Sequence, residues 1–324
     1  MKTFSLFSLL CLLHMISKSQ STYLAYDPLT GAHETNLHVS SGGSVWASAW
    51  NVQGGNNTGY LFDSIGLNYS SLQTTGGCIK GGYSWVQAGR YLDNQNNGAF
   101  QNYINAGNIG SEYGTTLYTS FLLQKSQSNN EEVYLSLHNS NVDWCSSCTN
   151  EKVSIGYFGT ASNIGGIRYW SLQIGDSVYQ SSIPIVNQQT TFFVLRTSFN
   201  TSNTIFDLYI NPTSLGNTGI PSTTSISAIS QNPIQFRSLG IYLGNQTNNG
   251  KLDELRFAST YAIAAPDSSI VLNLPPVSSF TMSSNIGASP MTVNFNGTAS
   301  YDPEGLPLIY SWNFGDYISL PDFS

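Results

Sequence analysis

The sequence predicts an all-β protein whose main part is one large β-sandwich or jelly roll. Helical periodicity is nearly absent, and short runs of alternating apolar and polar residues recur between clusters of Gly, Asn and Ser. About 240 residues carry this pattern, and all-β sandwiches often extend over about 200–250 residues as one domain. A single large sandwich is therefore expected before a second, smaller β unit.

The runs that we expect to form strands alternate along the chain between apolar and polar residues, as a half-buried strand requires. They comprise residues 115–123, 132–137, 152–158, 168–174, 191–199, 205–210, 239–243 and 252–258. Turn signals such as Asn211-Pro212 and Asn248-Asn249-Gly250 separate them.

Residues 1–21 have the order of a signal peptide: Lys2, then an apolar stretch over residues 3–16, then small polar residues. The apolar stretch is shorter than the roughly 20 residues of a membrane-spanning helix. A membrane anchor or a buried first strand is the alternative. Ser19-Gln20-Ser21 predicts cleavage near Thr22, and no later segment is apolar enough to span a membrane. The protein is therefore expected to be secreted, extracellular or at the cell surface.

Charged residues are rare, at 9% of the chain, where about a quarter is usual. The chain has 11 basic and 18 acidic residues, and Lys2 and Lys18 belong to the leader. This acidic balance argues against nucleic acid as a partner, because nucleic-acid binding depends on clustered Lys and Arg. An uncharged surface rich in Tyr and Asn is common among extracellular β domains that bind sugars, although it can equally be a solvated surface.

Three of the four cysteines follow the leader: Cys78, Cys145 and Cys148. The CxxC spacing of the last two does not predict zinc, because no second CxxC or His pair lies nearby, and no helix follows as in a redox motif. We expect a loop disulfide between Cys145 and Cys148, with a bond from Cys78 to one of them as the alternative.

The chain changes character after residues 22–265. Residues 266–275 form a short linker that leads to Pro275-Pro276, and a second β pattern occupies residues 276–324. Three expected strands cannot close a sandwich, and a unit this small is marginally stable without additional constraints.

This second pattern resembles the first part of a PKD (polycystic kidney disease) domain, an immunoglobulin-like sandwich. The resemblance rests on Pro290 before residues 291–295, on Ser300-Tyr301-Asp302-Pro303-Glu304-Gly305, and on residues 310–316, which read YSWNFGD. It implies an incomplete domain, because the family continues through further strands after Asp316.

Residues 22–265 resemble, more loosely, the concanavalin A-like and laminin-G-like jelly rolls of bacterial extracellular proteins. The similar segments are Ala25-Tyr26-Asp27-Pro28, residues 42–50, residues 207–212 and residues 252–257. In that family, jelly rolls next to PKD domains occur in large secreted or surface proteins, often ones that handle polysaccharide.

Some such jelly rolls are glycoside hydrolases, which need two carboxylates on one face of a strand, at positions i and i+2 or i+4. The sequence contains no E-x-D-x-E arrangement, and the acids of Glu131-Glu132 and of Asp253-Glu254 are adjacent, so each pair would point to opposite faces of a strand. Motifs of serine hydrolases and metalloproteases are also absent from the sequence. A lyase that uses His138 with Tyr134 and Arg168 is an alternative without a spacing signature.

Sugar sites stack rings on aromatic side chains, and four tryptophans are candidates: Trp46, Trp50, Trp85 and Trp144. The first two would share a face of a strand and can instead anchor the core. Trp85 and Trp144 have loop-like surroundings and are the better candidates for ligand contact.

Calcium is the ion that the jelly-roll resemblance implies, near the joined ends of the domain. Asp27 and Asp253 are the candidate ligands. Alternatively, Asp27 begins an Asp-Pro turn and Asp253 pairs with Arg256.

These observations predict a non-catalytic module that binds polysaccharide or cell-surface glycan, or mediates adhesion through other surface proteins. A polysaccharide-degrading lyase or hydrolase and a purely structural segment are the alternatives.

Overall fold

The computed structural model describes the part of the chain that spans residues 23–53, 59–81, 87–95, 97–105, 107–127, 130–139, 152–216, 219–244, 250–268, 277–284, 286, 292–301, 308 and 310. The chain divides into a unit of Thr22–Ile270 and a second unit that includes Val271–Ser324. No helix among the described residues is long and apolar enough to cross a membrane.

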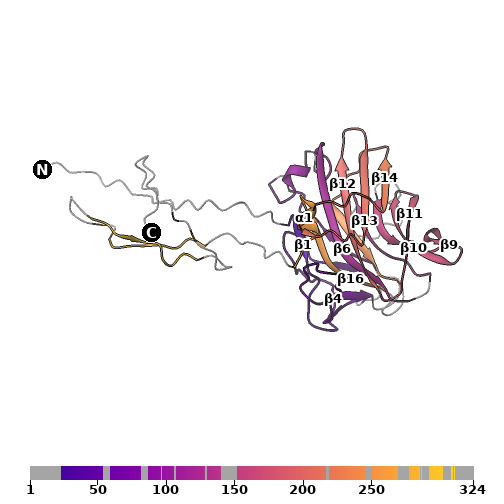
Figure 1. Ribbon diagram of the computed structural model, residues 1–324, viewed down its shortest axis with the longest axis horizontal. Helices are drawn as coiled ribbons and strands as arrows, with labels where there is room; N and C mark the ends of the chain where they lie inside the picture. The colour runs from indigo at the N-terminus through magenta and orange to yellow at the C-terminus, as the bar shows by residue number, and fades with distance from the viewer. Residues whose placement is uncertain are drawn as a thin grey trace. The chain divides into compact units, whose positions relative to one another are not determined.

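The first sheet of the larger unit has eight antiparallel strands, and β6, β12, β13 and β14 run side by side in it (Figure 1). β1 pairs with β16 beside the main path of the sheet. In spatial order the strands of that path are β14 (Ile226–Ser230), β13 (Thr204–Ile210), β12 (Thr190–Phe199), β6 (Thr115–Lys125), β16 (Gly250–Ala258), β4 (Cys78–Gly81) and β3 (Tyr60–Asp63); β1 is Ala25–Asp27.

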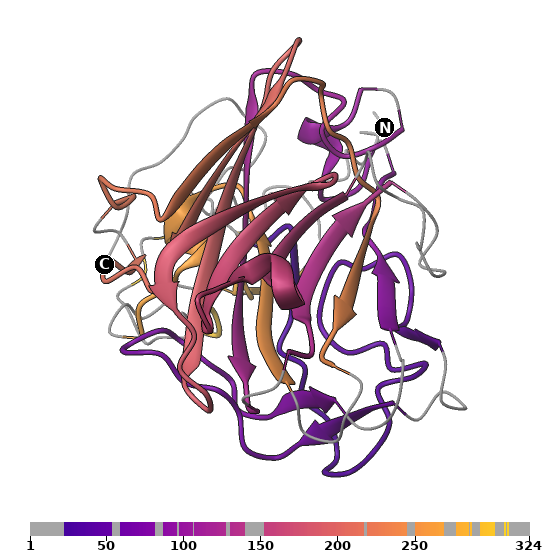
Figure 2. The ribbon, with the colours of Figure 1, turned by 90° about the vertical axis from the view of Figure 1, so that its right-hand side faces the viewer.

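The second sheet also has eight antiparallel strands, and β9–β11, at the right in Figure 1, face the viewer in Figure 2. β9 (Asn163–Ile164) pairs with β10 beside the main path. In spatial order the strands of that path are β11 (Ser177–Pro184), β10 (Ile167–Ile174), β8 (Lys152–Tyr157), β7 (Val133–His138), β15 (Ser238–Tyr242), β5 (Gln87–Tyr91) and β2 (Asn51–Gln53).

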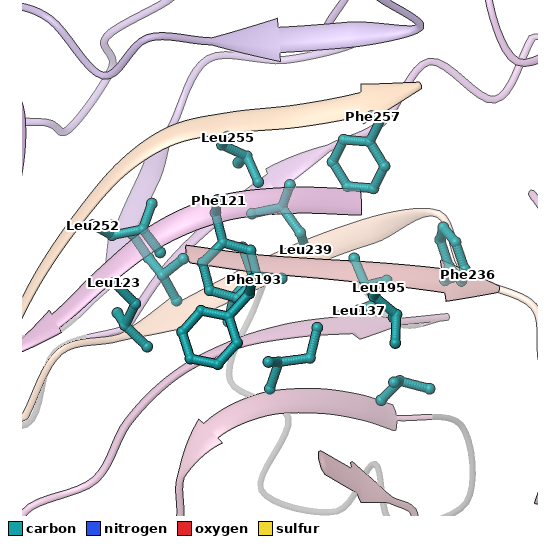
Figure 3. Close-up of a cluster of buried hydrophobic side chains, with 14 of the residues drawn as sticks. Phe121, Leu123, Leu137, Phe193, Leu195, Phe236, Leu239, Leu252, Leu255 and Phe257 are labelled. Carbon is teal, nitrogen blue, oxygen red and sulfur yellow. The ribbon is translucent and has the colours of Figure 1, made fainter. Parts of the chain in front are cut away.

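One continuous apolar core joins the two sheets, as alternate side chains of each strand point inward. Trp170 of the second sheet meets Phe193 of the first edge to face, with ring centroids 5.2 Å apart. Phe193 stacks on Phe121 at 5.1 Å, and Figure 3 shows these two rings among leucines from both sheets. Large apolar residues from both layers therefore hold the sandwich together.

Short helical segments lie between the strands: η2 (Gln101–Tyr103), η3 (Gly159–Ser162) and α1 (Tyr261–Ala264). The all-β fold class and the large sandwich are thus confirmed, and each of the eight predicted runs contains a strand.

The second unit holds two short strands, β17 (Thr281–Met282) and β18 (Phe295–Asn296), which pair antiparallel. Phe280 and Phe295 lie with ring centroids 6.4 Å apart, and Val277 bridges to Tyr301. The resemblance to a PKD domain stays a prediction. The leader and the linker also stay predictions, because residues 1–22 and 269–276 lie outside the described part of the chain.

Candidate functional site

The outer surface of the second sheet is polar, and we call it the polar face. The inward positions of its strands hold Leu, Ile, Val and Trp, so the residues between them point outward. The outward residues are Asn51, Gln53, Gln87, Gly89, Tyr91, Tyr134, Ser136, His138, Lys152, Ser154, Gly156, Ser171, Gln173, Val178, Gln180, Ser238, Gly240 and Tyr242. Among them Lys152, the register partner of His138, is the one residue of the Asp, Glu, Lys and Arg types.

The centre of the polar face carries very small side chains. The register places Gly89, Gly240, Ser136 and Ser154 in one row across four neighbouring strands. In the next row Gly156 follows Tyr134. A Cβ atom on Gly156 would lie 2.1 Å from the carbonyl oxygen of Val133, so only glycine fits there. Side chains therefore project less from the centre of the polar face than from its borders.

Aromatic residues border this low centre on one side. Tyr134 stacks on Tyr242 with ring centroids 5.5 Å apart, and Phe158 lies 5.5 Å from Tyr134. Gln87 Nε2 donates to the Tyr134 hydroxyl at 3.4 Å. Burial raises the pKa of Tyr242 to about 12 and also raises that of Tyr134, so both phenols stay protonated at ordinary pH.

His138 borders the centre on the other side, where its side chain is held by Ser238. The Ser238 hydroxyl donates to the His138 carbonyl at 3.1 Å and lies 3.0 Å from His138 Nδ1. Which atom donates in the second contact depends on the tautomer of the ring, whose other nitrogen is Nε2. That nitrogen would lie 3.1 Å from a Cβ atom on Gly240, which places it above the central row.

Two polar atoms of this face are buried without a hydrogen-bond partner: Ser154 Oγ and Gln180 Nε2. Ser154 is fully buried, and Gln180 lies directly opposite Ser171 in the register. A buried polar atom without a partner costs about 1–3 kcal/mol. Both atoms are enclosed by the protein, so they do not lie open at the surface of the face.

Trp46 and Trp50, two predicted ligand contacts, come together with Asp27 around a buried arginine. Their ring centroids lie 6.5 Å apart, and the Arg90 guanidinium carbon lies 4.6 Å from the Trp46 ring and 5.8 Å from the Trp50 ring. Trp50 is 1% exposed, and the indole N–H of Trp46 donates to the Tyr26 carbonyl at 3.0 Å. These contacts match the alternative reading, in which both rings anchor the core.

Asp27, a predicted calcium ligand, uses both of its carboxylate oxygens within the protein. Oδ1 accepts from the Leu29 N–H at 2.9 Å. Oδ2 accepts from Trp50 Nε1 at 2.8 Å and forms an ion pair with Arg90. Burial raises the pKa of Asp27, and Arg90 opposes that rise.

Asp253, the second predicted calcium ligand, accepts the N–H of Leu67 and that of Glu254, each at 2.8 Å. Arg256 pairs with Glu254 rather than with Asp253. Burial, together with the charge of Glu254, raises the pKa of Asp253 to about 8. In the described part of the chain no three His, Cys, Asp or Glu side chains group as a metal site, and the calcium site stays a prediction.

Four further predicted residues, Trp85, Trp144, Cys145 and Cys148, lie outside the described residues, so the disulfide and the loop tryptophans also stay predictions. Cys78 is a free, buried thiol that donates to the Ile65 carbonyl at 3.2 Å. Burial raises its pKa to about 12, which makes it unreactive at neutral pH.

The residues of the lyase alternative separate into two places. Tyr134 and His138 stand on the polar face, four residues apart on β7. Arg168 instead lies near Lys125 and Tyr157, whose pKa values respond to its charge, and Tyr157 belongs to the apolar core. The structure therefore does not bring these three side chains into one cleft.

Sequence reasoning missed the polar face, although its signal is present. In runs such as 133–138 (VYLSLH) and 152–157 (KVSIGY), half of the outward positions hold Ser or Gly, namely Ser136, Ser154 and Gly156. A solvated strand would carry longer polar side chains at such positions. What the sequence lacks is the order of the strands, which aligns these small residues.

No family model matches the chain, and no curated protein matches it in sequence. In solved structures the sandwich is similar to an endo-β-1,4-glucuronan lyase from the fungus Trichoderma reesei, at 10% identity and a TM-score of 0.38, covering 72% of this chain and 97% of that one. It is also similar to the seed lectin of Lotus tetragonolobus, at 9% identity and a TM-score of 0.35, covering 55% and 83%. For basic winged bean lectin bound to the Tn antigen, the identity is 9%, the TM-score 0.35 and the coverage 61% and 97%. These likenesses are too distant to transfer a ligand or an activity.

Proposed function

We propose that the protein is an extracellular carbohydrate-binding module whose polar face holds an uncharged polysaccharide. The observation that carries the proposal is the row of Gly89, Gly240, Ser136 and Ser154, which lowers the centre of the face between tyrosines and His138. Secretion through residues 1–21 and a spacer role for residues 276–324 belong to the proposal as predictions from the sequence.

The chemistry of the face supports a ligand rich in hydroxyl groups. Hydroxyls both donate and accept, and so do the Ser, Tyr, Gln and Asn side chains around the centre. Lys152 is the one charged residue among these outward positions, and the otherwise uncharged face favours a neutral chain over a charged one.

Binding rather than hydrolysis is favoured by the missing carboxylates. A glycosidase needs two carboxyl groups about 5–10 Å apart across the bond that it cleaves. None of the outward residues of the polar face carries a carboxylate.

The test is affinity electrophoresis of the protein against neutral glucans, xylan, mannan and galactan, with polyglucuronate as a charged comparison. We expect at least one neutral polysaccharide to retard the protein. Gly240→Val should weaken that binding at least tenfold, because the added side chain fills the low centre next to His138 and Ser136. Ile229→Gln, at an exposed position of the first sheet, is the matched control and should bind normally.

Binding to no polysaccharide, or equal binding by Gly240→Val, would refute the proposal. Release of unsaturated products from the same panel, abolished by His138→Ala, would instead establish the lyase alternative.

A further inference from the structure

A separate groove lies on the outer surface of the first sheet, at one end of β6 and β12 and beside the start of α1. Its volume is about 410 Å³, within the range of about 300–1,000 Å³ typical of small-molecule sites. The polar face belongs to the second sheet, so the two sites share no strand.

One wall of the groove is aromatic and held in place. Tyr118 of β6 and Tyr261 of α1 meet edge to face with ring centroids 6.2 Å apart. The Tyr261 hydroxyl donates to the Ser214 carbonyl at 2.7 Å, which fixes this ring. Ile220, 40% exposed, adds an apolar side chain to the same groove.

The polar part of the groove contains Arg196, whose positive charge is paired with Asp207. Arg196 Nη2 and Nε donate to Asp207 Oδ2 at 2.6 and 3.1 Å, and Ser227 donates to Asp207 Oδ1 at 2.7 Å. Burial raises the pKa of Tyr118, and the nearby charge of Arg196 opposes that rise. The Arg196 side chain is 33% exposed while that of Asp207 is 8% exposed. A guanidinium has five N–H donors, so Arg196 keeps donors beyond those that Asp207 takes.

Hydroxyl groups supply the remaining polar lining. Thr116 and Ser198 stand on neighbouring strands, with their hydroxyl oxygens 3.5 Å apart, and Ser259 and Thr260 contribute exposed hydroxyls before α1. A groove with an apolar wall, several hydroxyls and one oriented donor matches the two sides of a pyranose ring, which has C–H faces and hydroxyl edges.

We infer that this groove binds one ring of an uncharged pyranoside, independently of the polar face. The ligand is uncharged because Asp207 already neutralises Arg196, and a carboxylate on the sugar would have to approach that acid. The Arg196 donors and the Thr116 and Ser198 hydroxyls bind the ring hydroxyls, while Tyr118, Tyr261 and Ile220 cover its C–H surface.

The test is a two-dimensional amide NMR titration of the whole chain with methyl glucoside, galactoside, mannoside and xyloside, and with methyl glucuronide for comparison. We expect one neutral glycoside to shift the amides of Ser198, Ile220 and Ala262 with a dissociation constant of about 1–10 mM, a value usual for so small a contact. Ser198→Phe fills the groove and should weaken this binding at least tenfold. Thr116→Val removes one hydroxyl at constant size and should weaken it about threefold. Ile229→Gln is the control outside the groove.

Absence of shifts with every neutral glycoside, shifts unaffected by Ser198→Phe and Thr116→Val, or tighter binding of the glucuronide would overturn the inference. The variant Gly240→Val distinguishes failure of this inference from failure of the proposed function. If the groove binds, its shifts persist in that variant, whether or not the polar face holds a polysaccharide.

Discussion

The two outer surfaces of the sandwich differ in what their outward residues do. On the first sheet, Tyr118, Leu122, Phe192, Val194 and Tyr209 point outward and are buried under other parts of the same chain. Residues that cover them include Leu67, Leu72, Leu215 and Ile263. On the second sheet the outward residues are mostly polar or have no side chain.

This difference separates residues that stabilise the fold from residues that we expect to contact a polysaccharide. Apolar outward residues on the first sheet add a second hydrophobic cluster, which contributes to folding. The serines and glycines of the central row add little apolar burial, and of the glycines on this face only Gly156 is required by a backbone contact described above. We therefore expect substitutions in the covered apolar cluster of the first sheet to change stability and those on the polar face to change polysaccharide binding.

Phe192→Ala should have the largest effect. The ring is fully buried and lies 5.5 Å from that of Tyr69, so its removal should cost about 3–5 kcal/mol of unfolding free energy. Urea denaturation measures the loss, and polysaccharide binding by the remaining folded protein should be normal. A loss below about 1 kcal/mol would show that the outer cluster of the first sheet is not a stabilising layer.

The buried Asp253 should make stability fall as pH rises. Its folded pKa of about 8 lies above the usual unfolded value of about 3.9. The unfolded chain therefore releases this proton first, and stability falls between about pH 4 and pH 8. From pH 5 to pH 7 the loss should approach about 2–3 kcal/mol in the wild type.

Asp253→Asn should remove most of that dependence. Urea denaturation at pH 5, 6 and 7 compares the two proteins. Equal slopes in both would contradict the raised pKa of this carboxyl group.

Trp46→Phe distinguishes a core anchor from a ligand contact. The phenyl ring keeps an aromatic group beside Phe257, which now lies 6.0 Å from Trp46, and only the bond from the indole N–H to Tyr26 is lost. We expect a stability loss of about 1 kcal/mol and unchanged polysaccharide affinity. A tenfold loss of polysaccharide affinity in a variant that is as fully folded as the wild type would show that Trp46 contacts the ligand.

Two buried serines on opposite surfaces give the smallest and most closely matched comparison. Ser120, on the first sheet, donates to the Ala264 carbonyl at 2.5 Å, whereas Ser154 Oγ has no partner. Ser120→Ala should cost about 1–3 kcal/mol, whereas Ser154→Ala should raise stability, because it removes a buried hydroxyl that has no hydrogen-bond partner.

Neither substitution should change polysaccharide affinity. Ser154 Oγ is enclosed by the protein, and Ser120 lies on the first sheet. Thermal unfolding and affinity electrophoresis of both variants check the two halves of this prediction.

The strands that the sequence predicted are those with strong alternation, such as β12 and β7. Strands that it missed are short or rich in polar residues, such as β2 with its sequence NVQ and β14 with ISAIS. Strand positions follow from local side-chain pattern, and that pattern is weak over three to five residues.

The arrangement of the site could not be predicted, because it depends on long-range pairing. β15 lies between β7 and β5 although about 100 and 150 residues separate it from them. Only this pairing places Gly240 between Gly89 and Ser136. The roles of Asp27 and Trp50 were hidden for the same reason, since their common partner Arg90 lies on another strand.

Hydrogen–deuterium exchange of the protein with and without a polysaccharide that it binds tests the central claim most directly. The polar face predicts slower exchange in β7, β8 and β15 on binding, with β3 and β4 of the first sheet unchanged. Protection confined to the first sheet, with none in β7, β8 or β15, would contradict the assignment of the binding site.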